Sequence, residues 1–66
     1  MRIHLNGESR EMTEPLTIAE LLESAGYGVR RVAVEVNRDI VPKSRHSAHR
    51  LQDGDRVEIV QAIGGG

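Results

Sequence analysis

A short segment with clear start and stop signals, residues 17–26, most constrains what this chain can fold into. Thr17 is a natural helix N-cap, and Glu20 stands three residues later, as a capping box requires. Gly26 lies where a left-handed C-cap ends a helix. The apolar side chains within these limits share one face at helical spacing: Ile18, Leu21, Leu22 and Ala25. Because a helix of about nine residues is not stable alone in water, the rest of the chain must provide the surface on which it packs.

The chain before this helix has the pattern of a β-hairpin. Residues 1–5 alternate apolar and polar side chains, which places the apolar ones on one face of a strand. Asn6 and Gly7 follow, a pair favoured in tight hairpin turns because both turn positions adopt positive φ. A polar second strand near residues 9–12 is expected at the edge of the sheet, and Pro15 ends it because proline has no N–H to donate.

The chain after the helix contains three further strand signals. Residues 32–36 are rich in β-branched side chains and alternate in character, which predicts the strongest strand. A turn at residues 37–39 leads to a short strand at residues 40–41. The last strand is expected at residues 56–60, with Val57 and Ile59 facing inward, after the tight turn at residues 53–55.

These elements together predict one α+β domain. Between the last two strands, residues 43–50 are polar and irregular, with room for a single helical turn, and Leu51 is the expected anchor into the core. A helix between an N-terminal hairpin and later strands can cover one face of a mixed sheet. We therefore predict a ubiquitin-like β-grasp, with a mixed four- or five-stranded sheet packed on one helix.

Composition excludes several classes of function. The 66 residues include no cysteine, so disulfides, thiolate metal sites and cysteine nucleophiles are excluded. Nine Lys and Arg against ten Asp and Glu give a net charge of −1, whereas nucleic-acid binders usually concentrate a basic surplus. No segment approaches the roughly 20 apolar residues of a membrane span. We expect a soluble, cytoplasmic protein that binds neither nucleic acid nor membranes.

The C-terminal segment, residues 62–66, is the feature that folding does not explain. Its sequence is Ala-Ile-Gly-Gly-Gly, and glycine loses the most backbone entropy on ordering, so such a run is useful only where a partner holds it. From Gln61 onward an extended chain reaches roughly 20 Å, which is enough to enter a narrow channel and present a carboxylate there. We expect a folded domain, residues 1–61, and a flexible functional tail, residues 62–66. Sequence alone leaves open that the tail is only a frayed terminus.

The whole chain resembles the ThiS family, the sulfur carrier proteins of thiamine biosynthesis. Its most specific points of resemblance are the segment from Asn37 to Pro42, the Asp-Gly-Asp turn at residues 53–55 and the Gly65-Gly66 end at this chain length. Further matching segments lie at residues 1–7, 17–22, 34–37 and 51–59.

The resemblance implies a protein substrate rather than an enzyme. In that family the terminal glycine, here Gly66, is adenylated by an adenylyltransferase related to the ubiquitin-activating enzymes, which uses ATP and magnesium. Sulfur from a cysteine desulfurase pathway then converts the adenylate to a thiocarboxylate, and thiazole synthase receives the sulfur. No stably bound cofactor and no metal are implied for the chain itself.

Docking to such partners requires exposed apolar surface near the tail. Val60 alternates away from the core-facing positions of the last strand, although single exposed aliphatic residues are common. Ile40 is a weaker candidate because it can instead fill the core. The residues expected to contact partners are Ile40, Val60, Ala62, Ile63, Gly64 and Gly65.

Two smaller signals have simple interpretations. His46 and His49 are three residues apart and could meet on a helical turn, but no cysteine or third ligand accompanies them, so we expect surface histidines and no metal site. Arg30 and Arg31 form an adjacent basic pair that either steers an acidic partner or belongs to a solvated loop.

Two other functions remain open on the residues alone. A related Gly-Gly sulfur carrier of molybdopterin or cysteine synthesis would end in the same way, as would a protein modifier joined to target lysines. Molybdopterin carriers tend to be longer and richer in aromatic residues than this chain. A noncovalent β-grasp binding module is the other alternative, but it would have no use for a free Gly-Gly end.

The nature of residues 64–66 predicts that they are mobile in the isolated protein, because nothing in their own chemistry can order them. Backbone amide relaxation should give order parameters below about 0.6 there, against about 0.85 in the strands. Values typical of the strands at all three glycines would contradict the prediction.

Overall fold

A computed structural model describes residues 1–13, 16–28 and 30–61. Within these residues the chain forms five strands in one sheet, one α-helix and one 3-10 helix, so the predicted α+β class is confirmed. The strands are β1 (Arg2–Leu5), β2 (Glu8–Glu11), β3 (Val32–Val36), β4 (Asp39–Val41) and β5 (Arg56–Gln61). The helices are α1 (Ile18–Ser24) and η1 (Lys43–Arg45).

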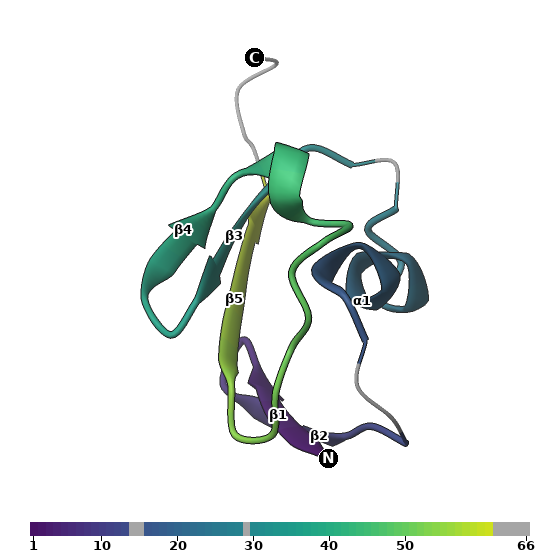
Figure 1. Ribbon diagram of the computed structural model, residues 1–66, viewed down its shortest axis with the longest axis vertical. Helices are drawn as coiled ribbons and strands as arrows, with labels where there is room; N and C mark the ends of the chain where they lie inside the picture. The colour runs from purple at the N-terminus through teal and green to yellow at the C-terminus, as the bar shows by residue number, and fades with distance from the viewer. Residues whose placement is uncertain (14–15, 29, 62–66) are drawn as a thin grey trace.

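The last strand in the sequence lies in the centre of the sheet (Figure 1). The strand order is β2-β1-β5-β3-β4, with β5 parallel to β1 and antiparallel to β3. The pairing of β5 with β3 runs from Val36–Val57 to Val32–Gln61, so the strand is one residue longer than predicted. A parallel neighbour cannot be reached by a tight turn, and the chain between β1 and β5 accordingly contains α1 and the rest of the sheet.

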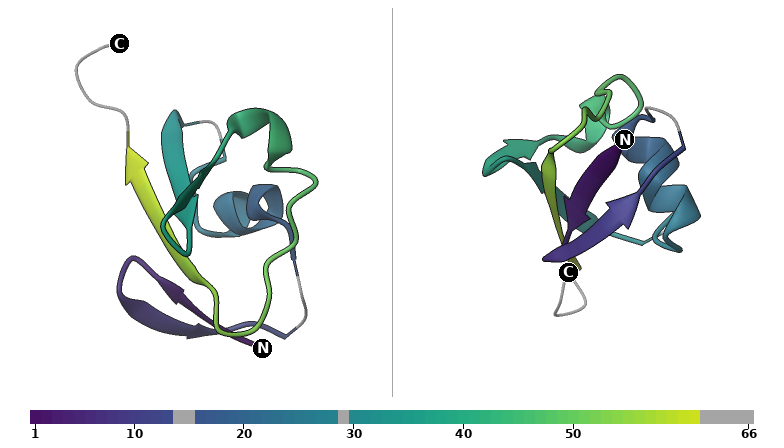
Figure 2. Two further views of the ribbon diagram at one scale, coloured as in Figure 1. Left: turned by 60° about the vertical axis from the view of Figure 1, so that its left-hand side comes forward. Right: turned by 90° about the horizontal axis from the view of Figure 1, so that it is seen from below.

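One face of the sheet is covered by α1 and the other is open (Figure 2). Leu21 and Leu22 of the helix are buried, as its apolar pattern predicts. Leu51, which belongs to the long connection between η1 and β5, is buried as well. Burying a side chain of this size contributes roughly 1.5–3 kcal/mol. The core is entirely aliphatic and consists of Ile3, Leu5, Ile18, Leu21, Leu22, Val34, Val36, Val41, Leu51, Val57 and Ile59.

The predicted helix caps are present. Thr17 Oγ1 accepts a hydrogen bond from the Glu20 N–H at 3.2 Å, and Glu20 Oε1 accepts one from the Thr17 N–H at 2.8 Å. The hydrogen bond from the Thr17 N–H is the main cause that lowers the pKa of Glu20 below its ordinary value, and a hydrogen bond from the Thr17 hydroxyl group is the second. Gly26 has φ of +89°, as a left-handed C-cap requires, and the helix ends at Ser24 with Ala25 as its cap.

The turn between β3 and β4 is shorter than predicted. Asn37 and Arg38 have φ of 51° and 74°, which is the conformation of a two-residue hairpin turn. Asp39 was expected in this turn but instead opens β4 and pairs with Val36. A two-residue turn matches the right-handed twist of the flanking strands, which explains why the strands pair up to its edges.

The prediction that His46 lies on the surface is wrong. Its exposed fraction is 7%, and its Nε2 lies 3.0 Å from the carbonyl oxygen of Val41. Because a carbonyl oxygen can only accept, this nitrogen carries the proton and donates. The His46 carbonyl in turn accepts from the Ala19 N–H at 3.0 Å, so His46 ties η1 to both β4 and α1.

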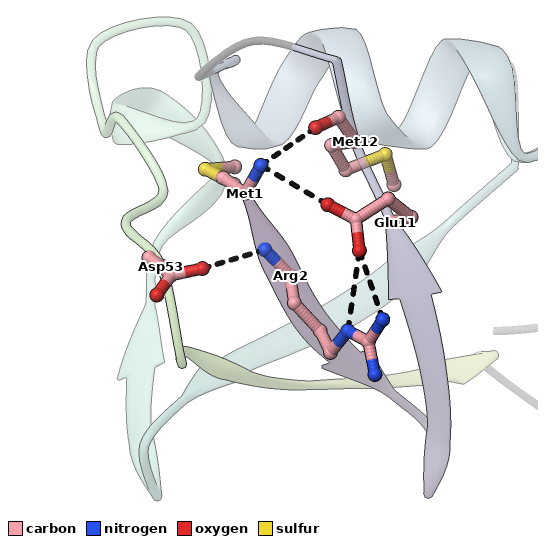
Figure 3. A network of polar contacts seen from close by, with 5 residues as sticks. All are labelled: Met1, Arg2, Glu11, Met12 and Asp53. Atoms are coloured by element: carbon pink, nitrogen blue, oxygen red, sulfur yellow. Dashed lines mark hydrogen bonds and ion pairs between the residues drawn. The ribbon is translucent and has the colours of Figure 1, made fainter.

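Polar contacts fasten the first strand to its neighbours (Figure 3). The Met1 ammonium donates to the Met12 carbonyl oxygen at 2.8 Å and to the Glu11 carboxylate at 3.3 Å. The Arg2 guanidinium donates to Glu11 Oε1 at 3.0 and 3.2 Å, and the Arg2 N–H donates to Asp53 Oδ1 at 2.6 Å. The Arg2 guanidinium, followed by the Met1 ammonium, lowers the pKa of the Glu11 carboxyl group.

This network predicts a defined effect of pH. A carboxyl group whose pKa is lowered by folding stabilises the folded state above the unfolded pKa, here about 4.5, and this contribution is lost as pH falls through the folded value. Arg2→Gln should therefore move the Glu11 pKa up towards 4.5. Carbon-detected NMR titration of the Glu11 carboxyl group measures this shift. A Glu11 pKa that is low and unchanged in Arg2→Gln would contradict the assignment of Arg2 as the main cause.

Candidate functional site

Asparagine side chains hold the strand that leads to the C-terminal segment. Asn6, in the first hairpin turn, accepts a hydrogen bond from the Ile59 N–H at 2.7 Å through Oδ1. Asn37, in the second hairpin turn, accepts one from the Arg56 N–H at 3.0 Å and donates through Nδ2 to Asp55 at 3.0 Å. Both turns therefore bond to β5 or to the residue before it. A partner that pulls on the C-terminal segment would therefore pull on a strand in which every residue pairs with β1 or β3.

Two large aliphatic side chains are exposed within the described residues, and both were predicted as partner contacts. Ile40 in β4 is 70% exposed and Val60 in β5 is 56% exposed. The alternative that Ile40 fills the core is wrong, because its neighbour Val41 faces inward and is buried. Exposure confirms that both side chains are accessible, and their contact with a partner stays a prediction.

The sheet register places these two residues on the same open face but not in contact. Val60 lies opposite Ala33 on β3, and Ile40 lies opposite Glu35, which also faces Glu58. Ile40 and Val60 are thus separated by β3 and by two residues along the strands, or about 12 Å from standard sheet spacings. Ala33, exposed beside Val60, extends the apolar surface and was missed from sequence, although its alternation with the buried Val34 was a usable signal.

The remaining predicted site residues lie beyond this part of the chain. Ala62, Ile63, Gly64, Gly65 and Gly66 fall outside the described residues, so their roles and the mobility expected for the glycines stay predictions. The structure does describe Gln61, the residue to which this segment is attached. Gln61 pairs with Val32 on β3, next to the row formed by Ala33 and Val60.

The described residues contain no cluster of side chains suited to holding a metal ion. Among residues 1–13, 16–28 and 30–61 there is no group of three or more possible metal ligands, and His46 uses Nε2 on a backbone carbonyl. The lowered pKa values of Glu11 and Glu20 arise from Arg2 and Thr17 in exposed structural contacts. Over the same residues no helix is long and apolar enough to cross a membrane.

Three comparisons with known proteins, by family model, by sequence and by structure, give the same result. The family model described as "ThiS family" matches residues 3–66. A sulfur carrier protein ThiS from Escherichia coli K12 is 33% identical over 66 residues, which is the full length of both chains. A crystal structure of a thiamine biosynthesis protein (ThiS) from Geobacter metallireducens matches with a TM-score of 0.87 and 30% identity, covering 100% of both chains.

A higher identity occurs with part of a larger protein. A protein named thiazole synthase from Paramagnetospirillum magneticum is 46% identical over all 66 residues, and these are 20% of its length. A second one, from Magnetococcus marinus, is 41% identical, also over 20% of its length. The chain therefore spans about a fifth of these relatives. With the family model covering nearly the whole chain and the fold matching end to end, the chain belongs to the ThiS family, the sulfur carrier proteins of thiamine biosynthesis, and has their β-grasp fold.

Proposed function

We propose that the α-carboxylate of Gly66 is the group that carries sulfur. The observation that supports this most is the position of β5: the central strand of the sheet ends at Gln61, directly before a five-residue segment that closes in three glycines. The family model extends through this segment to residue 66. Side-chain-free residues allow a close approach of the backbone to a partner's active site, which side chains would obstruct.

The chemistry begins with activation, because a carboxylate is a poor electrophile. The Gly66 carboxylate attacks the α-phosphorus of ATP in the site of an adenylyltransferase related to the ubiquitin-activating enzymes, and pyrophosphate leaves. Magnesium in that site balances the phosphate charge. The chain supplies the acyl group and needs no base, metal or cofactor of its own.

Sulfur enters by displacement of AMP. The terminal sulfur of a persulfide, formed in a cysteine desulfurase pathway, attacks the acyl carbon of the adenylate. A thiol then reduces the resulting acyl disulfide, so that one sulfur atom stays on Gly66 as a thiocarboxylate. The carrier is a protein substrate throughout this sequence and works, in our proposal, in the cytoplasm.

Thiazole synthase is the proposed recipient of the sulfur. Two proteins with that name contain a region similar to this entire chain within a polypeptide about five times longer, which supports a close partnership. Both the adenylyltransferase and the recipient must accept the same segment, residues 62–66. We propose that they recognise it together with the open sheet face around Ala33, Ile40 and Val60.

The sulfur chemistry predicts a single modification at a known position. Incubated with its activating enzyme, ATP, magnesium and a persulfide source, the protein should gain the mass of one oxygen-to-sulfur exchange, and fragmentation should place it at Gly66. Deletion of Gly66 or the change Gly65→Trp should abolish the product, whereas Gly64→Ala, a matched control with a small side chain, should retain it. The buried core residues of the part that the structure describes lie between Ile3 and Ile59, so we expect stability to change by less than about 0.5 kcal/mol.

Two outcomes would contradict this proposal. Sulfur gained at another group, with the α-carboxylate of Gly66 unchanged in the fragmentation, would show that the terminal carboxylate is not the carrier. An amide bond between Gly66 and lysines of other proteins, with no sulfur gained, would assign the chain to the protein modifiers.

The proposed recognition of the open sheet face predicts a separate effect on the kinetics of adenylation. Val60→Gln and Ile40→Gln should each raise the KM for the carrier in the adenylation reaction by about tenfold and leave kcat unchanged, because they remove apolar contacts outside the reacting group. ATP–pyrophosphate exchange measures both constants. Ser9→Gln, on the open face of β2, is the matched control and should leave KM unchanged. An unchanged KM in both substituted proteins would exclude this face without affecting the role of Gly66.

A further inference from the structure

A groove between α1, the start of β3 and η1 has no part in the function proposed above. It encloses about 710 Å³ and opens on the side of β3 that faces the helix. Its lining includes Ala19 and Leu22 from α1 and Val32 from the start of β3. An apolar lining of this kind can receive an aliphatic side chain of a partner.

The charged residues of the groove are mostly basic. Arg30, Arg31 and Lys43 line it together with one carboxylate, Glu23, although the chain as a whole has a net charge of −1. Within the described residues, the ion pairs join Met1 and Arg2 to Glu11 and Arg10 to Glu8, so none involves these three cations. The basic charge is therefore available to an acidic ligand.

The groove also runs beside a part of β3 with which β4 does not pair. β4 pairs with β3 only from Val34 onward, so β4 does not extend along Val32 and Ala33. Because Val32 pairs with Gln61 on its other side, the groove lies at the end of the sheet where β5 ends, and η1 stands at the same end in Figure 1. An extended segment placed here would continue the line of β4 along β3.

We propose that this groove binds an extended, acidic segment of a protein partner. An aliphatic side chain of the segment contacts Leu22 and Val32, and its carboxylates pair with Arg30, Arg31 and Lys43. A nucleotide fits the site less well, because the lining offers no aromatic ring for stacking except the imidazole of His46, which is buried and bound to Val41. The inference goes beyond the proposed function, since it involves neither the open sheet face nor the sulfur chemistry.

A peptide titration of the full-length protein tests this proposal. The probe is a short capped peptide with one leucine flanked on each side by two acidic residues, and amide shifts of the ¹⁵N-labelled protein report its binding. Shift changes should centre on Ala19, Leu22, Val32 and Lys43. Arg30→Glu combined with Arg31→Glu should weaken binding about tenfold, since two exposed ion pairs become repulsive contacts. The double change Arg10→Glu with Arg38→Glu alters the net charge equally and should leave binding unchanged.

A charge-swapped probe makes the test decisive. The same peptide with lysine at every acidic position should bind the Arg30→Glu, Arg31→Glu protein and not the native one. Equal binding of both peptides to the native protein, or shift changes confined to residues outside the groove, would overturn the proposal. Concentration-dependent shifts at the groove without any peptide would identify a second copy of the chain as its occupant and overturn it as well. Because Gly66 takes no part in the titration, a negative result leaves the sulfur-carrier proposal intact.

Discussion

The pairing of β5 with both β1 and β3 is the constraint on which the rest of the structure depends. Val57 and Ile59 of this strand are buried in the core, and its backbone bonds to strands from both halves of the chain. Asn6 and Asn37, each in a hairpin turn, add side-chain hydrogen bonds to it or to the residue before it. The two hairpins are therefore joined through β5, the last strand in the sequence.

This position has a functional consequence. A segment that leaves from an edge strand could detach that strand when a partner pulls on it, whereas β5 pairs with β3 from Val57 to Gln61 and with β1 at Arg56 and Val57. Gln61, the last described residue, is itself held in the sheet by its pairing with Val32. The acyl transfer proposed above benefits from such a fixed attachment point, because the reacting group has to be positioned accurately.

Two surfaces of different character lie at this end of the sheet. The open face presents Ala33 and Val60 near the end of β5 with Ile40 farther away, and the groove on the helix side carries Arg30, Arg31 and Lys43. β3 contributes to both, since Ala33 is exposed on the open face and also lines the groove. Both surfaces lie near Gln61, the last described residue of β5, since Val32 pairs with Gln61 and Ala33 pairs with Val60.

The sequence by itself determined the elements and their caps, because these depend on neighbours in the chain. The capping box of Thr17 and Glu20, the positive φ of Gly26, the alternation in β3 and the turn at Gly54 all follow from local hydrogen bonds and side-chain periodicity. The inward positions, such as Leu21 and Leu51, follow from the same periodicity combined with the need of a small chain to bury its few apolar residues. The terminal glycines also stood out in the sequence, since no local element uses them.

Only the tertiary structure decided the features that join distant segments. The burial of His46 depends on β4 and α1 packing against η1, and no pattern within residues 43–50 encodes those neighbours. The exposure of Ile40 depends on which face of a three-residue strand meets the helix, and so short a strand carries too little alternation to fix it. The groove requires α1, β3 and η1 together, and how these separate elements pack is not encoded within any one of them. Local patterns specify backbone conformation, whereas a binding surface is set by long-range packing, which here includes the pairing of β5 with strands from both halves of the chain.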